Sequence, residues 1–121
     1  MNYESSAEVQ STVIPGVTFV VSKMSVGRRL DLIRRIRELL LRHEFLDGGS
    51  SPTEKLEAAC VSAEIDRLYF EWGLQKLAGI DVDGIPATPE LLASRGPENL
   101  YREIVTAVKS QCELSDGERK N

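Results

Sequence analysis

Hydrophobic residues between positions 51 and 77 recur at helical spacing on two sides of the chain. Ser51-Pro52-Thr53-Glu54, just before them, is typical of a capping box with proline in the first helical position. One apolar stripe runs from Leu56 to Leu77. The other stripe holds Val61, Ile65, Leu68, Tyr69 and Trp72. A surface helix needs one apolar stripe, so this pattern predicts a long helix covered on both sides, either by the rest of a small domain or by another protein.

Residues 26–46 predict a second long helix, for which Ser25 is the expected N-cap. Its central apolar stripe holds Val26, Leu30, Ile33, Ile36 and Leu40. Six arginines accompany this stripe, and Arg34 and Arg35 fall largely off it. Two interpretations stay open. The arginines form a solvated face with partners on their own helix. Alternatively, some of them meet the acidic residues of the helix at 51–77 or an acidic partner protein.

The remaining pattern predicts shorter elements. Residues 17–24 alternate like a strand, and Asp-Gly within residues 80–87 indicates a small β-hairpin. Residues 89–94 and 97–112 predict two further helices, each beginning near a proline. The turn residues at 47–50 are few, so the two long helices are expected to lie antiparallel.

These elements predict a mainly α fold. Its centre is an αα-hairpin of the two long helices, closed by the C-terminal helix, with a short N-terminal strand and a small β-hairpin at the rim. Residues 1–15 contain few large apolar side chains and no helical period, so we expect a flexible arm there. Residues 16–121 are expected to form a single helical domain.

Composition narrows the function classes. The chain has 121 residues, 41% of them hydrophobic and 28% charged, which suits one domain with a modest core. Its net charge of −4 provides no general attraction to nucleic acid or to anionic membranes. No apolar run approaches the roughly 20 residues of a membrane span, and the polar N-terminus does not resemble a signal peptide. We therefore expect a cytoplasmic protein with no nucleic-acid or membrane partner.

The sequence contains no recognisable catalytic or metal-binding motif. It has a single histidine and no glycine-rich phosphate loop. Cys60 and Cys112 are interpreted as small buried hydrophobes in a reducing compartment rather than a disulfide or a metal pair. We predict that the protein is not an enzyme and has no cofactor, metal or catalytic residues.

Four stretches carry a resemblance to a known group. They are residues 63–74 (Ala-Glu-Ile-Asp-Arg-Leu-Tyr-Phe-Glu-Trp-Gly-Leu), 82–88 (Val-Asp-Gly-Ile-Pro-Ala-Thr), 96–100 (Gly-Pro-Glu-Asn-Leu) and 114–121 (Leu-Ser-Asp-Gly-Glu-Arg-Lys-Asn). In these stretches the chain resembles small proteins encoded in the tail modules of bacteriophages and prophages, most of all tail assembly chaperones. The resemblance implies a small helical protein in the bacterial cytoplasm that binds the tape-measure protein and helps the tail tube polymerise around it.

Taken together, pattern and resemblance predict a non-enzymatic assembly chaperone or adaptor that binds a tape-measure or other tail protein. The expected protein-binding residues are Val61, Ile65, Leu68, Tyr69, Trp72, Arg34 and Arg35. In the alternative interpretation both stripes are internal and Trp72 belongs to the core. Two other functions stay open: a structural subunit of a phage tail or another multimeric assembly, and a small bacterial regulatory protein-binding module. Self-association is compatible with each.

Overall fold

A computed structural model describes the backbone of residues 1–47 and 51–120, and the side chains of residues 1–42 and 51–112. Within them the helices are α1 (Val26–Asp47), α2 (Pro52–Gly73), α3 (Pro89–Arg95) and α4 (Glu98–Lys120). The strands are β1 (Ser6–Gln10), β2 (Thr18–Ser22), β3 (Leu74–Ala78), β4 (Asp81–Val82) and β5 (Ile85–Pro86). The short connection predicted at 47–50 falls mostly on residues 48–50, which lie outside the described residues.

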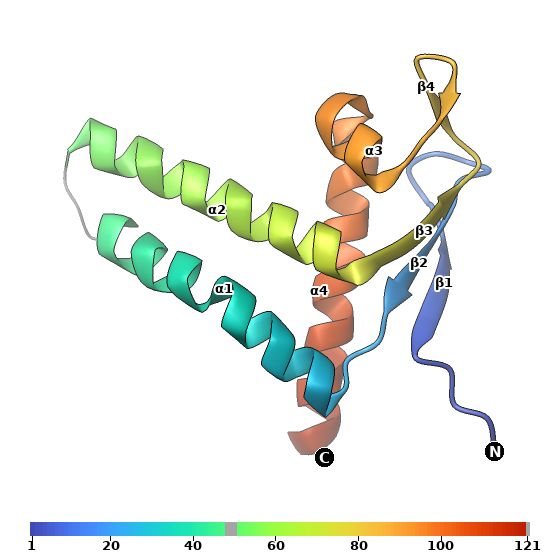
Figure 1. Cartoon of the computed structure of the whole chain (residues 1–121), viewed down its shortest axis with the longest axis horizontal. Coiled ribbons are helices and arrows are strands. Elements are labelled where there is room, and N and C mark those ends of the chain that lie inside the picture. Colours follow the sequence, from blue (N-terminus) through green and yellow to red (C-terminus); the bar gives the residue numbers. More distant parts are fainter. Residues whose placement is uncertain (48–50, 121) are drawn as a thin grey trace. The chain divides into compact units, whose positions relative to one another are not determined.

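The fold is mixed α/β, so the prediction of a mainly α fold is wrong. The four helices accompany two antiparallel sheets, one of three strands in the order β1-β2-β3 and one of two strands, β4-β5 (Figure 1). Sequence patterns predicted β2 and the β4-β5 hairpin but missed β1 and β3. The three-stranded sheet was therefore not foreseen.

Strand β1 lies within the stretch that was predicted to be a flexible arm. It pairs antiparallel with β2, with Ser6 opposite Ser22 and Gln10 opposite Thr18. Val9 is the only large apolar side chain of this strand. Hydrogen bonding to the neighbouring backbone orders this segment, and that pairing leaves little trace in the hydrophobic pattern.

Strand β3 replaces the end of a helix that was predicted to continue to Leu77. Helix α2 ends at Gly73, where a Cβ atom would collide with the Val108 side chain of α4. The chain then extends, and Leu77 lies opposite Phe19 of β2. Leu74 and Leu77 fit a helical stripe equally well, so their spacing alone could not locate this change of structure.

By the contacts among its residues, the chain divides into two compact units. The sheet unit comprises Met1–Met24 and Phe70–Asn121, and the helical unit comprises Ser25–Tyr69. Most of α2 belongs to the helical unit, and its last turn belongs to the sheet unit.

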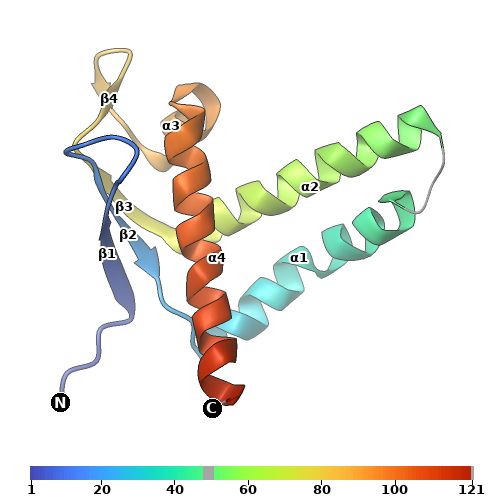
Figure 2. The ribbon, with the colours of Figure 1, turned by 180° about the vertical axis from the view of Figure 1, so that it is seen from behind.

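In the sheet unit, α4 packs on β2 and contacts α3, which in turn contacts β3 and β4 (Figure 2). Leu100, Ile104 and Val108 are fully buried, as their spacing on one side of α4 requires. The ring centres of Phe70 and Tyr101 lie 4.8 Å apart. The predicted C-terminal helix therefore exists, and its apolar side packs on a sheet.

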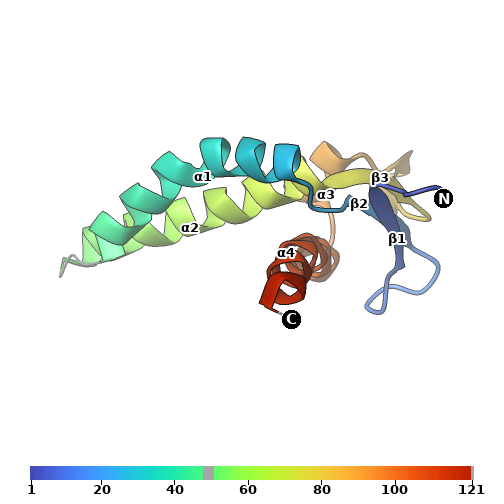
Figure 3. The ribbon, with the colours of Figure 1, turned by 90° about the horizontal axis from the view of Figure 1, so that it is seen from below.

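In the helical unit, α1 and α2 lie side by side and antiparallel (Figures 1 and 3). Ala58, Val61 and Ile65 of α2 form a buried cluster, against which Leu39 of α1 and Tyr69 pack. The two predicted helix starts are confirmed. The Arg28 amide donates to Ser25 Oγ at 3.2 Å and the Glu54 amide to Ser51 Oγ at 3.1 Å.

Candidate protein-docking surface

The structure covers most of the stripe that was predicted to bind a partner. Val61 and Ile65 are buried in the helical unit, and Leu68 and Tyr69 are half-buried. Trp72 is buried in the sheet unit. Only Arg34 and Arg35 of the predicted set are exposed. Reaching the three buried side chains would require a partner to open a packed core.

Exposed apolar side chains gather instead on α1. It carries five of the ten large hydrophobic side chains that are exposed among the described residues. They are Val26, Leu30, Ile33, Leu40 and Leu41, which we call the α1 face. Their exposed fractions run from 44% for Leu40 to 72% for Val26. Their spacing places them on one side of the helix, so they form a continuous strip rather than scattered contacts.

A shallow hollow lies at the C-terminal half of the α1 face. Ile33, Ile36, Arg37, Leu40 and Leu41 line it, and its volume is about 280 Å³. Ile36 is buried, whereas the other four side chains are exposed. The hollow can therefore receive an apolar side chain from another molecule without any rearrangement of the core.

Positive charge accompanies the α1 face. Arg37 lies within it and Arg34 at its border, since 3.6 residues per turn place them beside Leu30, Ile33 and Leu41. Among the described side chains no carboxylate lies within ion-pair distance of Arg34 or Arg37. Arg35 points elsewhere and pairs with Asp31 at 3.0 Å. The predicted pair Arg34 and Arg35 is thus divided between two sides of the helix.

The sequence analysis placed Val26, Leu30, Ile33 and Leu40 in an apolar stripe but named none of them as a binding residue. A signal was nonetheless present, because Arg37 stands between apolar positions of the stripe. An arginine in the middle of a covered stripe would need a buried acidic partner. Its position indicates that this part of α1 is accessible.

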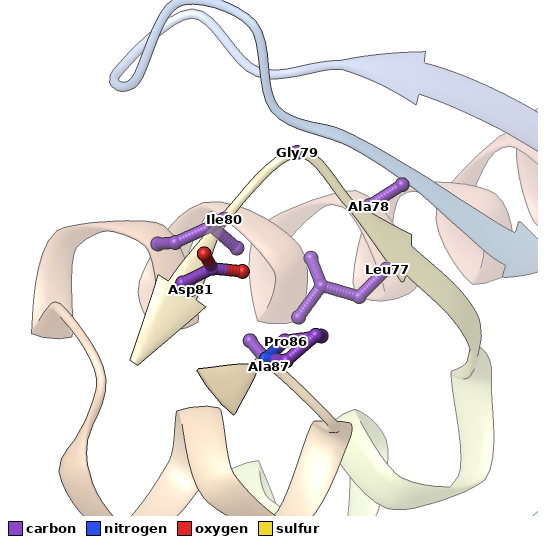
Figure 4. A pocket seen from close by; sticks show the side chains of 7 residues that line it. All are labelled: Leu77, Ala78, Gly79, Ile80, Asp81, Pro86 and Ala87. Carbon is purple, nitrogen blue, oxygen red and sulfur yellow. The ribbon is translucent and has the colours of Figure 1, made fainter. Parts of the chain in front are cut away.

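A second hollow, of about 420 Å³, lies in the sheet unit between the end of β3 and the β4-β5 hairpin (Figure 4). Its lining residues are Leu77, Ala78, Gly79, Ile80, Asp81, Pro86 and Ala87. Asp81 is the only ionisable residue of that lining. The lining supplies no second acid or base to act together with this carboxylate.

Three further features of the described residues bear on the sequence predictions. Cys60 is exposed and Cys112 half-buried, so the prediction that both are buried is wrong. Within the described residues, no three histidine, cysteine or acidic side chains lie together as a metal site would require. None of the helices in this part of the chain combines the length and the hydrophobicity of a membrane span.

Comparison with models of known protein families gives no match, and neither curated proteins nor solved structures match the chain.

Proposed function

We propose that this protein works by binding another protein through the α1 face, as an assembly chaperone or adaptor. The observation that carries the proposal is the strip of five exposed apolar side chains on one helix. Contiguous exposed apolar surface on a folded protein usually marks an interaction site, because leaving it in water is unfavourable. The residues lie on a regular helix, so the surface is preorganised before a partner binds.

The resemblance to tail assembly chaperones makes a tape-measure protein the first partner to test. A tape-measure protein is long and helical, and it exposes apolar surface before the tail tube closes around it. An apolar helix face is suited to such a partner. The α1 face supplies this contact with its side chains already accessible, unlike the buried residues Val61, Ile65 and Trp72.

Co-expression with the tape-measure protein of the same tail gene cluster tests the proposal. Ile33→Asp introduces a charge into the centre of the α1 face and should abolish co-purification. The matched control is Ile85→Asp, which makes the same change at an exposed isoleucine of β5 in the sheet unit. The free energy of unfolding of each variant should lie within about 1 kcal/mol of that of the unmodified protein, because both side chains are exposed.

Retention of the partner by Ile33→Asp would contradict the proposal. Mass spectrometry of purified phage particles then separates two roles for the same surface. A chaperone is absent from the finished tail, whereas a structural subunit is present in it.

A further inference from the structure

The position of Arg37 restricts what can cover the α1 face. We infer that the partner segment is an amphipathic α-helix whose apolar stripe is bordered by carboxylates, and that these carboxylates pair with Arg34 and Arg37. This inference rests on the proposed function of the α1 face and specifies the chemistry of its partner.

The first step concerns the arginine within the strip. Arg37 follows Ile33 by one helical turn and precedes Leu41 by another, so it emerges between side chains that a partner would cover. Covering a guanidinium without an acceptor costs several kcal/mol. Within the described residues no carboxylate of this chain pairs with it. A carboxylate of the partner can supply the acceptor, because it binds a guanidinium with two parallel hydrogen bonds.

The second step concerns the sign of the charges around the α1 face. Asp31 is engaged with Arg35 on another side of α1. Arg34, at the border of the face, has no ion pair among the described side chains. The face therefore carries two accessible positive charges, and a partner with acidic borders is favoured over one with basic borders.

The third step concerns shape. From Val26 to Leu41 the strip extends about 22 Å at 1.5 Å per residue, the length of a partner helix of about 15 residues. The hollow beside Ile33 and Leu40 is large enough for one large side chain at about 280 Å³. A ridge of apolar side chains every three or four residues fits such a surface, as in ordinary helix packing.

Nucleic acid fits this surface less well. Its backbone would meet two arginines among aliphatic side chains, whereas phosphate recognition needs several basic groups and base recognition benefits from aromatic ones. A carboxylate-bordered helix satisfies the charges and covers the apolar strip at the same time.

Three synthetic helical peptides of 16 residues test the inference with the full chain. The acidic peptide carries a leucine stripe bordered by glutamates, the basic peptide replaces these by lysines, and the third keeps the glutamates but scrambles the stripe. Calorimetry at physiological salt should show that the acidic peptide binds at least about tenfold more tightly than the other two.

Variants of the chain make the test specific. Arg37→Glu should reverse the preference toward the basic peptide. Arg42→Glu is the matched control, because it makes the same charge change on another side of α1, and it should leave the preference unchanged. Ile33→Asp should weaken binding of every peptide that carries the leucine stripe.

Several outcomes would overturn the inference. Equal binding of acidic and basic peptides would show an apolar site without charge selection, and equal binding of the scrambled peptide would show attraction by charge alone. Binding to anionic phosphatidylglycerol vesicles without binding to any peptide would indicate a lipid surface instead. If no peptide binds although Ile33→Asp still loses the co-purified protein, the proposed function stands and the inferred partner chemistry is wrong.

Discussion

Helices α4 and α1 have similar amphipathic patterns, but their apolar side chains differ in burial. Both carry aliphatic residues at intervals of three and four along one side. On α4, Leu100, Ile104 and Val108 are fully buried, whereas on α1 half of the Ile33 side chain and most of Val26 face solvent. An apolar stripe therefore shows that a side of a helix favours contact, but not whether the chain itself provides that contact.

The neighbours of the two helices explain the difference. Helix α4 packs on the three-stranded sheet at β2, whose Phe19 and Val21 side chains are themselves fully buried. A sheet offers a broad surface that can cover a wide stripe. Within the helical unit α1 has α2 as its neighbour, and their contact centres on Ala58, Val61 and Ile65. One helix covers only one sector of another, so α2 leaves another apolar sector of α1 uncovered.

The largest expected effect contrasts the two stripes directly. Ile104→Ala in α4 should lower the free energy of unfolding by about 3 kcal/mol, because it removes fully buried methyl groups and leaves a cavity. Ile33→Ala in α1 should change it by no more than about 0.5 kcal/mol, because the side chain is half exposed and alanine favours a helix. Urea unfolding of the two variants measures this contrast. Equal losses of unfolding free energy in the two variants would contradict this contrast and show that the α1 face is part of the core.

A smaller effect should sharpen the contrast by probing the tight backbone packing of the sheet unit. Gly79 has φ +90°, and a Cβ atom there would collide with the carbonyl oxygen of Gly16. Gly79→Ala should therefore cost about 2–3 kcal/mol. Gly84 is the control: its φ is +78°, but no atom lies within 4 Å of a Cβ placed there. Gly84→Ala should lower the free energy of unfolding by only about 1 kcal/mol. Thermal unfolding of both variants measures the difference. Similar costs would show that the close approach to Gly16 contributes nothing.

The smallest effect concerns a polar contact that also ties the sheet unit together. Ser11 Oγ donates to Glu103 Oε1 at 2.6 Å, and the amide and hydroxyl of Thr12 donate to Glu103 Oε2, each at 2.8 Å. Burial alone would raise the pKa of the Glu103 carboxyl, but hydrogen bonds from Ser11, Thr12 and the Val13 backbone together lower it below its usual range. The ionised carboxylate accepts these bonds best.

The sign of the pH dependence follows from this lowered pKa. The contribution of Glu103 to stability is present above the ordinary glutamate pKa of about 4.3 and is lost as the pH falls through the lower folded value. Glu103→Gln should therefore weaken the acid dependence of unfolding in that range and leave binding by the α1 face unchanged. Direct NMR titration of Glu103 checks the cause, and a pKa at or above the usual value would contradict it.

Local chemistry predicted the helix starts and the small turns. Ser25, Ser51 and Thr88 each accept a hydrogen bond from an amide three residues later, as N-cap residues do. Asp83 and Gly84 both have positive φ, as the Asp-Gly hairpin signal requires. These features depend on neighbours in the sequence, so the sequence alone is sufficient to indicate them.

Most of the predicted binding residues lie on another helix than the α1 face. An apolar surface with arginines was expected, but it was placed on α2 at Val61, Ile65 and Trp72, which the structure buries. Both α1 and α2 carry apolar residues in excess of what one contact covers. Which of them faces inward depends on how the two helices meet, and a stripe of hydrophobic residues does not encode that choice.

The sequence by itself determined where the helices begin, where the tight turns lie and which sides of the helices are apolar, because those properties arise within a few residues. Only the tertiary structure decided that Ser6–Gln10 and Leu74–Ala78 are strands, because both depend on hydrogen bonds to β2. For Leu74–Ala78, this partner strand is distant in the sequence. It likewise decided that α4 is covered while the α1 face is left accessible. Burial is a property of the neighbours that a side chain meets, and those neighbours are brought together only by the fold.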